Sequence, residues 1–167
     1  MGSSTDLQNR LILCNVSGFS LPRESIHTRL LLTQGGERAG SVFVMARAPS
    51  REGPETPLEM LNRPEGFFPF LPDDQKEVLL VSRAQTIALT IPAPGGKPGP
   101  GAIEIGLEVA LVDGTVWNGV AEVVLPQSMS RPIDYLNAGG GPFFAVTTNH
   151  ATHLVNRAHV LYARPTD

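Results

Sequence analysis

The chain has 167 residues, of which 41% are hydrophobic and 17% charged, and its net charge is −3. This balance is typical of a globular protein and argues against disorder. Lysine occurs only as Lys76 and Lys97 and the arginines are scattered, so the sequence disfavours a nucleic-acid partner. No apolar run approaches the roughly 18 residues of a membrane span, and the N-terminus lacks an export signal. Since Cys14 is the one cysteine, no intrachain disulfide can form, and we expect a cytoplasmic protein.

Residues 1–10 are polar and small, which predicts a flexible N-terminus. Downstream, glycine and proline punctuate short apolar runs, a pattern typical of strands joined by turns. We expect strands over residues 11–16, 26–33 and 41–46, with a hairpin turn at Gln34-Gly35-Gly36 between the last two.

The next segment has the pattern of a short helix. Thr56 can cap it, Pro57 fits the first helical position, and Glu59 can complete a capping box. Asn62-Arg63-Pro64 should end the helix after one or two turns. Residues 67–71 should then cover a core edge, and residues 77–91 should form a long strand, bent near Ser82-Arg83.

Residues 92–101 are almost entirely proline and glycine and are predicted to be a linker. Residues 103–112 and 115–125 should form a hairpin around Asp113-Gly114, a sequence typical of a type I′ turn. A second short helix is expected at 130–137, ended in a left-handed cap by Asn137 and Gly139. A strand at 143–146 and either one long strand or a bent pair at 152–163 complete the chain.

Two phrases of the sequence occur twice. Residues 57–62 (PLEMLN) match residues 132–137 (PIDYLN) at an offset of 75, and residues 80–85 (LVSRAQ) match residues 154–159 (LVNRAH) at an offset of 74. Paired phenylalanines follow the first phrase both times, at 67–68 and 143–144. We interpret the chain as a tandem duplication, with a first β repeat at 11–91, the linker at 92–101 and a second β repeat at 102–167.

We therefore expect an all-β protein, because no predicted helix is long enough for a parallel crossover. It should consist of two tandem homologous repeats, each a small barrel-like or bent sheet with a one-turn helix. We expect the repeats to pack with pseudo-two-fold symmetry. They could form two separate barrels or exchange strands into one unit.

The second repeat resembles a poorly characterised bacterial family of β-rich repeats. Its motif, Arg-x-x-Asp-Tyr-Leu-Asn, then Phe, then Val-Asn-Arg-x-His-Val, is found here between Arg131 and Val160. The pattern around Leu111–Gly119 and the Val-Asn-Arg segment also resemble the signatures of Sm-like or SH3-like barrels. The family resemblance implies a compact β-rich domain. The first repeat departs from the motif at Glu59, Met60, Ser82 and Gln85, so binding by these polar positions is expected only in the second repeat.

The motif supplies the candidate binding residues for a ligand or partner: Asp134, Tyr135, Asn137, Asn156, Arg157 and His159. Capping and turn chemistry explains the same residues without a ligand, and we favour that interpretation. Asp134 would stabilise the first turn of the helix and Asn137 would cap its end. Arg157 would leave a tight turn and reach back to Asp134.

Other kinds of chemistry find little support in the sequence. His150, His153 and His159 are not at zinc spacing, and His153 and His159 would lie about 20 Å apart on one straight strand. Cys14 lies in an apolar run and Ser17 lacks a nucleophile elbow. We therefore expect no catalytic residue, no metal and no cofactor.

We expect a non-catalytic cytoplasmic module that binds another protein or self-associates. Two alternatives stay open. One is a sensor for a small ligand or nucleotide that uses the second repeat, and the other is an Sm-like RNA-binding protein.

Overall fold

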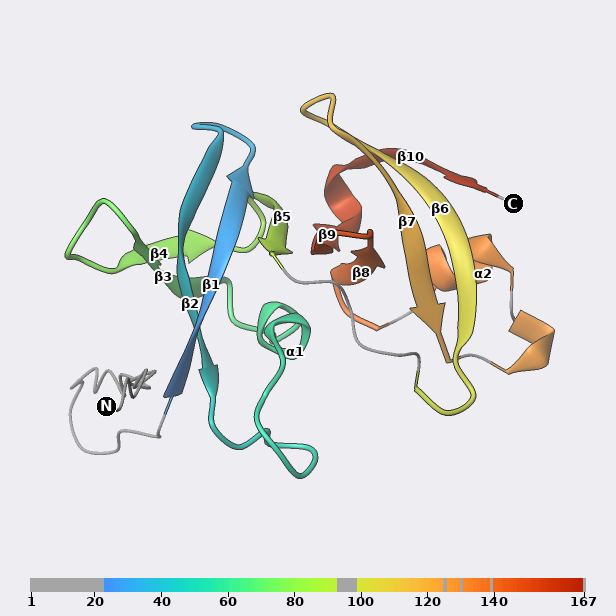
Figure 1. Ribbon diagram of the computed structural model, residues 1–167, viewed down its shortest axis with the longest axis horizontal. Coiled ribbons are helices and arrows are strands. Elements are labelled where there is room, and N and C mark those ends of the chain that lie inside the picture. Colours follow the sequence, from blue (N-terminus) through green and yellow to red (C-terminus); the bar gives the residue numbers. More distant parts are fainter. Residues whose placement is uncertain (1–22, 93–98, 125, 130, 139, 167) are drawn as a thin grey trace, which may run out of the picture.

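The computed structural model describes residues 23–92, 99–124, 126–129, 131–138 and 140–166. We call residues 23–92 the first half and residues 99–166 the second half. The first half contains β1 (Arg23–Leu32), β2 (Glu37–Met45), α1 (Pro57–Leu61), β3 (Phe67–Pro72), β4 (Leu79–Ser82) and β5 (Thr86–Ile91). The second contains β6 (Ile103–Leu111), β7 (Val116–Val123), η1 (Gln127–Met129), α2 (Pro132–Asn137), β8 (Phe143–Thr147), β9 (Thr152–Asn156), η2 (Arg157–His159) and β10 (Val160–Pro165). The expected all-β class is confirmed (Figure 1).

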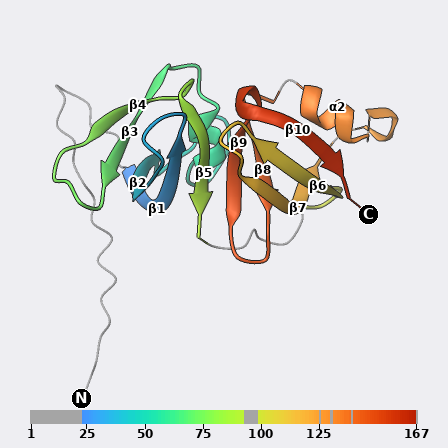
Figure 2. The ribbon, with the colours of Figure 1, turned by 90° about the horizontal axis from the view of Figure 1, so that it is seen from above.

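All ten strands belong to one antiparallel sheet, in the order β10-β6-β7-β8-β9-β5-β1-β2-β3-β4. Each half contributes five neighbouring strands, and the halves follow the same internal order: the last strand lies beside the first, followed by the second, third and fourth. β5 of the first half pairs with β9 of the second, and we call this pair the junction (Figure 2). The sheet is therefore continuous across the two halves, and no strand is exchanged between them.

The strand order does not confirm the expected pseudo-two-fold packing. A two-fold axis makes every contact reciprocal, so the pairing of β5 with β9 would require the equivalent pairing of β10 with β4, but these two strands lie at opposite ends of the sheet. The junction instead joins unlike edges, because β5 is the last strand of its half and β9 the fourth of its own. The two halves are thus arranged head to tail. The sheet does not close on itself among the described strands, since it runs from β10 at one edge to β4 at the other.

The beginnings of both helices follow the sequence pattern closely. Glu59 donates its backbone N–H to Thr56 Oγ1 (3.2 Å), and Thr56 donates its own to Glu59 Oε2 (2.8 Å), which is the predicted capping box. The left-handed end expected for α2 falls partly on Gly139, which lies outside the described residues. Of the described residues, Asn137 is the last helical residue and Ala138 after it is extended (φ −64°, ψ 139°).

The turn between β6 and β7 also differs from the prediction. Gly114 donates its N–H to the carbonyl of Leu111, and Leu111 donates to the carbonyl of Thr115. Gly114 is therefore the fourth residue of the turn, at φ +91°, and a three-residue loop replaces the expected two-residue type I′ turn. The Asp113 carboxylate accepts from the N–H and the hydroxyl of Thr115, which stabilises the longer loop.

The predicted strand at 77–91 is two strands rather than one bent strand. β4 pairs with β3, whereas β5 pairs with β1 and β9, so the chain changes neighbours at Arg83–Gln85. Residues 152–163 form the expected bent pair, β9 and β10, with η2 between them. The strand expected at 11–16 and most of the predicted linker lie outside the described residues.

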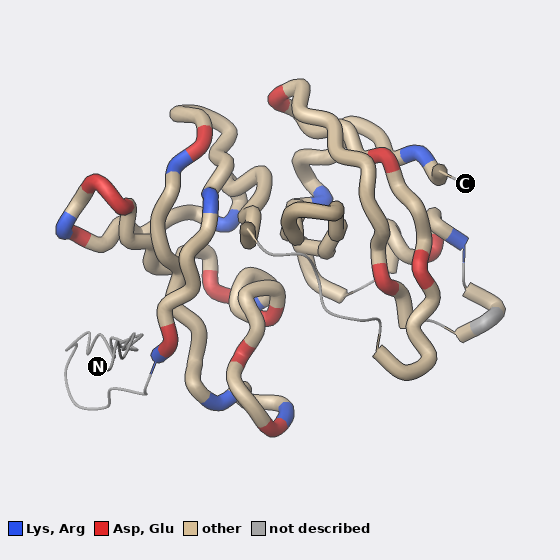
Figure 3. Tube along the Cα trace, viewed as in Figure 1, with Lys and Arg blue, Asp and Glu red and all other residues tan. Residues whose placement is uncertain are grey.

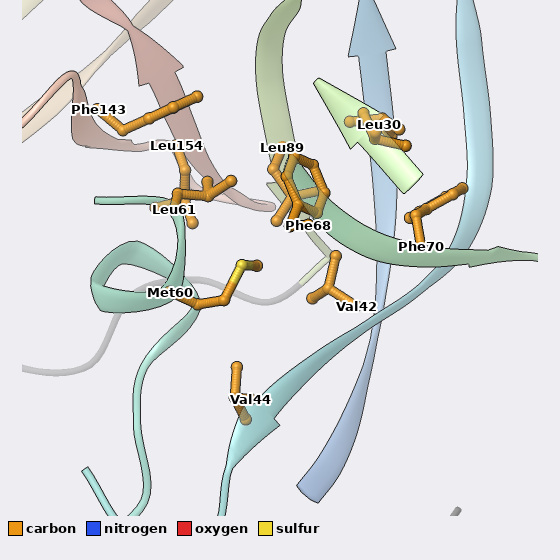
Figure 4. Packing of buried hydrophobic residues seen from close by; sticks show 11 residues of the cluster. Leu30, Val42, Val44, Met60, Leu61, Phe68, Phe70, Leu89, Phe143 and Leu154 are labelled. Carbon is orange, nitrogen blue, oxygen red and sulfur yellow. The ribbon is translucent and has the colours of Figure 1, made fainter. Parts of the chain in front are cut away.

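Two hydrophobic clusters make up the core, and each contains side chains from the other half. The cluster of the first half buries Leu61, Phe68 and Leu89 together with Phe143 and Leu154 of the second half (Figure 4). The cluster of the second half, around Leu107 and Val146, likewise includes Ile87 and Ala88 of the first half. The halves therefore share their cores at the junction.

Candidate functional site

Arg157 is used to bind backbone carbonyls around α2. Its guanidinium donates to the carbonyl oxygens of Leu136 (3.1 Å), Phe143 (3.2 Å) and Gly141. It also lies 5.2 Å from the centre of the Phe144 ring. The expected pair with Asp134 is wrong, because Arg157 binds carbonyls at the start of β8 and at the end of α2, where helix carbonyls lack partners within the helix.

Arg83 makes the equivalent contacts in the first half. It donates to the carbonyl oxygens of Leu61 (3.1 Å), Phe67 (2.5 Å) and Glu65, and lies 5.5 Å from the centre of the Phe68 ring. Burial lowers the pKa of both guanidinium groups. In both halves, then, an arginine at the end of the fourth strand fixes the end of the short helix.

Asn156 and His159 connect the two halves. The buried Asn156 amide donates to the carbonyls of Arg83 (3.3 Å) and Thr86 (3.0 Å), and its oxygen accepts from the Ala158 N–H (3.0 Å). His159 Nε2 lies 2.6 Å from the carbonyl oxygen of Ala84. Two of the six candidate residues therefore bind the chain between β4 and β5.

The candidate residues of α2 lie apart from these two. Asp134 accepts from the backbone N–H (3.3 Å) and guanidinium (2.8 Å) of Arg131, and these bonds lower the pKa of its carboxyl. Tyr135 packs edge to face on Phe144 with 5.9 Å between ring centres, and burial raises its pKa. Asn137 is exposed and makes no side-chain hydrogen bond to a described residue. The six residues therefore do not converge on one pocket.

The sequence did not predict that the side-chain amide of Asn62 joins the two halves. Asn62, which follows α1, accepts from the Phe143 N–H (2.8 Å) and donates to the Phe143 carbonyl (3.1 Å). The Asn62 side chain thus binds the first residue of β8 as a neighbouring strand would. The repeated phrases offered one indication of this role, because Asn62 and Asn137 occupy equivalent positions and both are asparagine.

His153 is buried at the junction. Its Nδ1 lies 2.9 Å from Thr90 Oγ1 on β5, and its ring stacks on Trp117 with 3.8 Å between centres and 11° between planes. Burial, followed by the charge of Arg29, lowers the pKa of His153 to about 4. A neutral His153 therefore occupies the junction at physiological pH.

Two strand edges lack a partner among the described residues, β4 at one end of the sheet and β10 at the other. Large apolar side chains are exposed at both. Phe67 and Leu80 are 61% and 74% exposed near β4, and Leu161 and Tyr162 are 64% and 53% exposed on β10. Edges of this kind are templates for pairing with another chain.

An open hollow lies along β10. It is lined by the end of α2, by Phe144 and Arg157, and by β10 from Val160 to Ala163. Leu136 and Asn137 are the α2 residues that face it. The hollow thus combines apolar lining residues with Asn137, the one candidate residue that makes no side-chain hydrogen bond to a described residue.

Other kinds of site receive no support from the described residues. No three His, Cys, Asp or Glu side chains among them are grouped as metal ligands. In the described part of the trace, basic residues lie at separate points and acidic residues are interspersed with them (Figure 3). No helix in the same part is long and apolar enough to cross a membrane.

Comparisons of the chain with protein-family models, with curated proteins and with solved structures find no match.

Proposed function

We propose that this chain is a non-catalytic, cytoplasmic protein-interaction module that binds partners by adding a strand at the edges of its sheet. The observation that carries the proposal is the pair of unpartnered strands, β4 and β10, with exposed apolar side chains beside both. Strand addition supplies main-chain hydrogen bonds for affinity and side-chain pockets for specificity. The hollow beside α2 provides such a pocket next to β10.

The hydrogen bonds made by the polar residues of the motif support a non-catalytic role. Arg157, Asn156 and His159 bind backbone carbonyls within the chain, and Asp134 binds Arg131. Side chains held in this way maintain the shape of the fold, and their polar atoms are occupied before any ligand arrives.

We also infer that the halves arose by duplication of a unit of the bacterial repeat family that the second half resembles. The shared strand order supports this origin, and so do the matching contacts of Arg83 and Arg157.

A small ligand in the hollow beside α2 is the second candidate, favoured by the presence of Asn137 and Arg157 in its lining. A thermal-shift screen with nucleotides and small anions tests it, because a ligand that binds only the folded state raises the Tm. A hit that is lost in Asn137→Ala would favour the sensor over the interaction module. RNA binding is disfavoured by the scattered basic residues.

Affinity capture from the native cell tests the interaction module. The baits are the wild-type chain, the edge variant Leu80→Lys/Leu161→Lys and the control Val112→Lys/Val116→Lys. The control changes residues of the β6–β7 hairpin that are 46% and 47% exposed and that belong to neither edge strand. We expect a partner captured by wild type and control and lost with the edge variant. Equal capture by all three baits would refute the use of the edges.

A further inference from the structure

The junction inside the chain shows what kind of strand fits each free edge. β5 and β9 pair antiparallel through Ala88–Val155, Leu89–Leu154, Thr90–His153 and Ile91–Thr152. β5 is the last strand of its half and β9 the fourth strand of the other. The free edges are the same two kinds of strand: β10 is the last strand of the second half, and β4 is the fourth of the first. Each copy therefore carries both strands of a second junction, which the described strands do not make within the chain.

The side chains at the edges match those buried at the junction. Phe143 and Leu154 are each 2% exposed, and their counterparts in the repeat alignment, Phe67 and Leu80, are 61% and 74% exposed. The residue types are identical, so the difference in burial comes from the first half, which packs against Phe143 and Leu154 and has no described counterpart beside β4. A strand that paired with β4 as β5 pairs with β9 would bury the side chains of Phe67 and Leu80.

The surface that Phe143 contacts at the junction also has a counterpart in the second half. In the first half, Phe143 belongs to the same core cluster as Leu61 and Leu89 (Figure 4), and Asn62 binds its backbone. The counterparts in the second half are Leu136, Ala163 and Asn137, and all three line the hollow beside α2. The hollow therefore occupies the position that Phe143 fills at the junction. The Asn137 amide, which makes no side-chain hydrogen bond to a described residue, lies where Asn62 lies in the first half.

We propose that the partner of these edges is a second copy of the chain: β4 of one copy pairs antiparallel with β10 of the next, and Phe67 enters the hollow beside α2. This rests on the proposed function and names its partner. If β4 and β10 pair in the same register as β9 and β5 at the junction, Tyr162 lies opposite Val81 and Ala163 lies opposite Leu80. Pro165 has no N–H to donate, so the pairing ends before it. Asn137 binds the backbone of the incoming Phe67.

The contact joins unlike edges, so every added copy leaves one β4 and one β10 free. Such a heterologous contact builds rings if the rotation closes and open chains if it does not. A symmetric dimer through two β4 strands or two β10 strands is a different arrangement, and the variants below distinguish it.

Two variants block one edge each. Leu80→Lys places a charge where β4 would be covered. Ala163→Pro removes a backbone N–H from the outer side of β10. The N–H of Thr166 faces β6, since it donates to the Gly106 carbonyl. Successive N–H groups of a strand point to opposite sides, so the N–H of Ala163, three residues earlier, faces away from β6. Val116→Lys, on the internal strand β7, is the matched control. Circular dichroism and urea unfolding check that each variant folds.

Sedimentation and light scattering of the full chain, from 5 to 200 µM, measure the assembly. We expect oligomers larger than a dimer for wild type and Val116→Lys, and monomers for Leu80→Lys and for Ala163→Pro. A mixture of the two edge variants should form a one-to-one dimer, because one supplies a free β10 and the other a free β4.

Three results would overturn the proposal. A monomeric wild type at all concentrations refutes self-assembly, and the proposed function survives that result if capture of another protein still depends on the edges. A dimer retained by one edge variant alone indicates a symmetric contact. Assembly only after removal of residues 1–22 assigns an edge to the N-terminal segment of the same chain.

Discussion

Acidification should destabilise the protein through His153. This imidazole is buried between β5 and Trp117, and its pKa is lowered from 6.5 to about 4. In the unfolded chain the same group binds a proton near its ordinary pKa of about 6.5. The unfolded state therefore binds more protons than the folded state between pH 6.5 and 4, so the free energy of unfolding falls as the pH falls through this window.

The size of the effect follows from the shift. One pKa unit corresponds to about 1.4 kcal/mol, so the full shift is worth about 3 kcal/mol at pH 4 and below. At pH 5 about 2 kcal/mol of it should already be lost relative to pH 7.5. The carboxyl of Glu59, whose pKa the Arg51 hydrogen bond lowers to about 2, loses its contribution between pH 4.5 and 2. The contribution of Glu59 therefore hardly overlaps that of His153.

Urea unfolding at pH 7.5 and at pH 5 measures the loss. Trp117 is the single tryptophan and stacks on His153, so its fluorescence reports on this part of the junction. His153→Gln is the control: its stability at pH 7.5 will differ from that of wild type, but its loss between the two pH values should be smaller by about 2 kcal/mol. Equal losses in wild type and variant would refute the role assigned to His153.

Three substitutions test the packing and caps. Asn156→Ala removes the buried side-chain hydrogen bonds to the carbonyls of Arg83 and Thr86 and from the Ala158 N–H, so it should lower the free energy of unfolding by about 2–4 kcal/mol. A loss below about 1 kcal/mol in urea would contradict this. Leu154→Ala should lower the free energy of unfolding by about 2–5 kcal/mol, because Leu154 is buried. Leu80→Ala should change the free energy of unfolding of the monomer by less than about 0.5 kcal/mol, because Leu80 is exposed. Similar Tm shifts for the two variants would refute this difference in burial. Thr56→Ala should cost about 1 kcal/mol by loss of the α1 cap, and restoration by Ser is the check.

Several features of the fold were predictable because they depend on neighbouring residues. The capping box of Thr56 and Glu59 formed as predicted, since a cap requires only residues three positions apart. Apolar runs separated by glycine and proline marked the strands well. The turn after Leu111 was predicted wrongly, because Asp113-Gly114 fits more than one loop length and the pairing of β6 with β7 selects among them.

The partners of the polar residues were less predictable. The pairing of Arg157 with Asp134 was expected from opposite charge, yet Arg157 binds carbonyls and Asp134 binds Arg131. A buried carbonyl without a partner is costly, and sequence does not show which carbonyls the fold leaves unpaired. The roles of Asn156 and Asn62 depend on the first half meeting the second, which no local pattern encodes.

The sequence by itself determined the strands, the two short helices and the repeated phrases, because these follow from residue spacing along one stretch of chain. Only the tertiary structure decided which edges meet. Phe67 and Phe143 are the same residue in the same repeat position, but one is exposed and the other buried. Burial depends on the strands that lie alongside: β9 lies between β8 and β5, whereas β4 has a described neighbour, β3, on one side only.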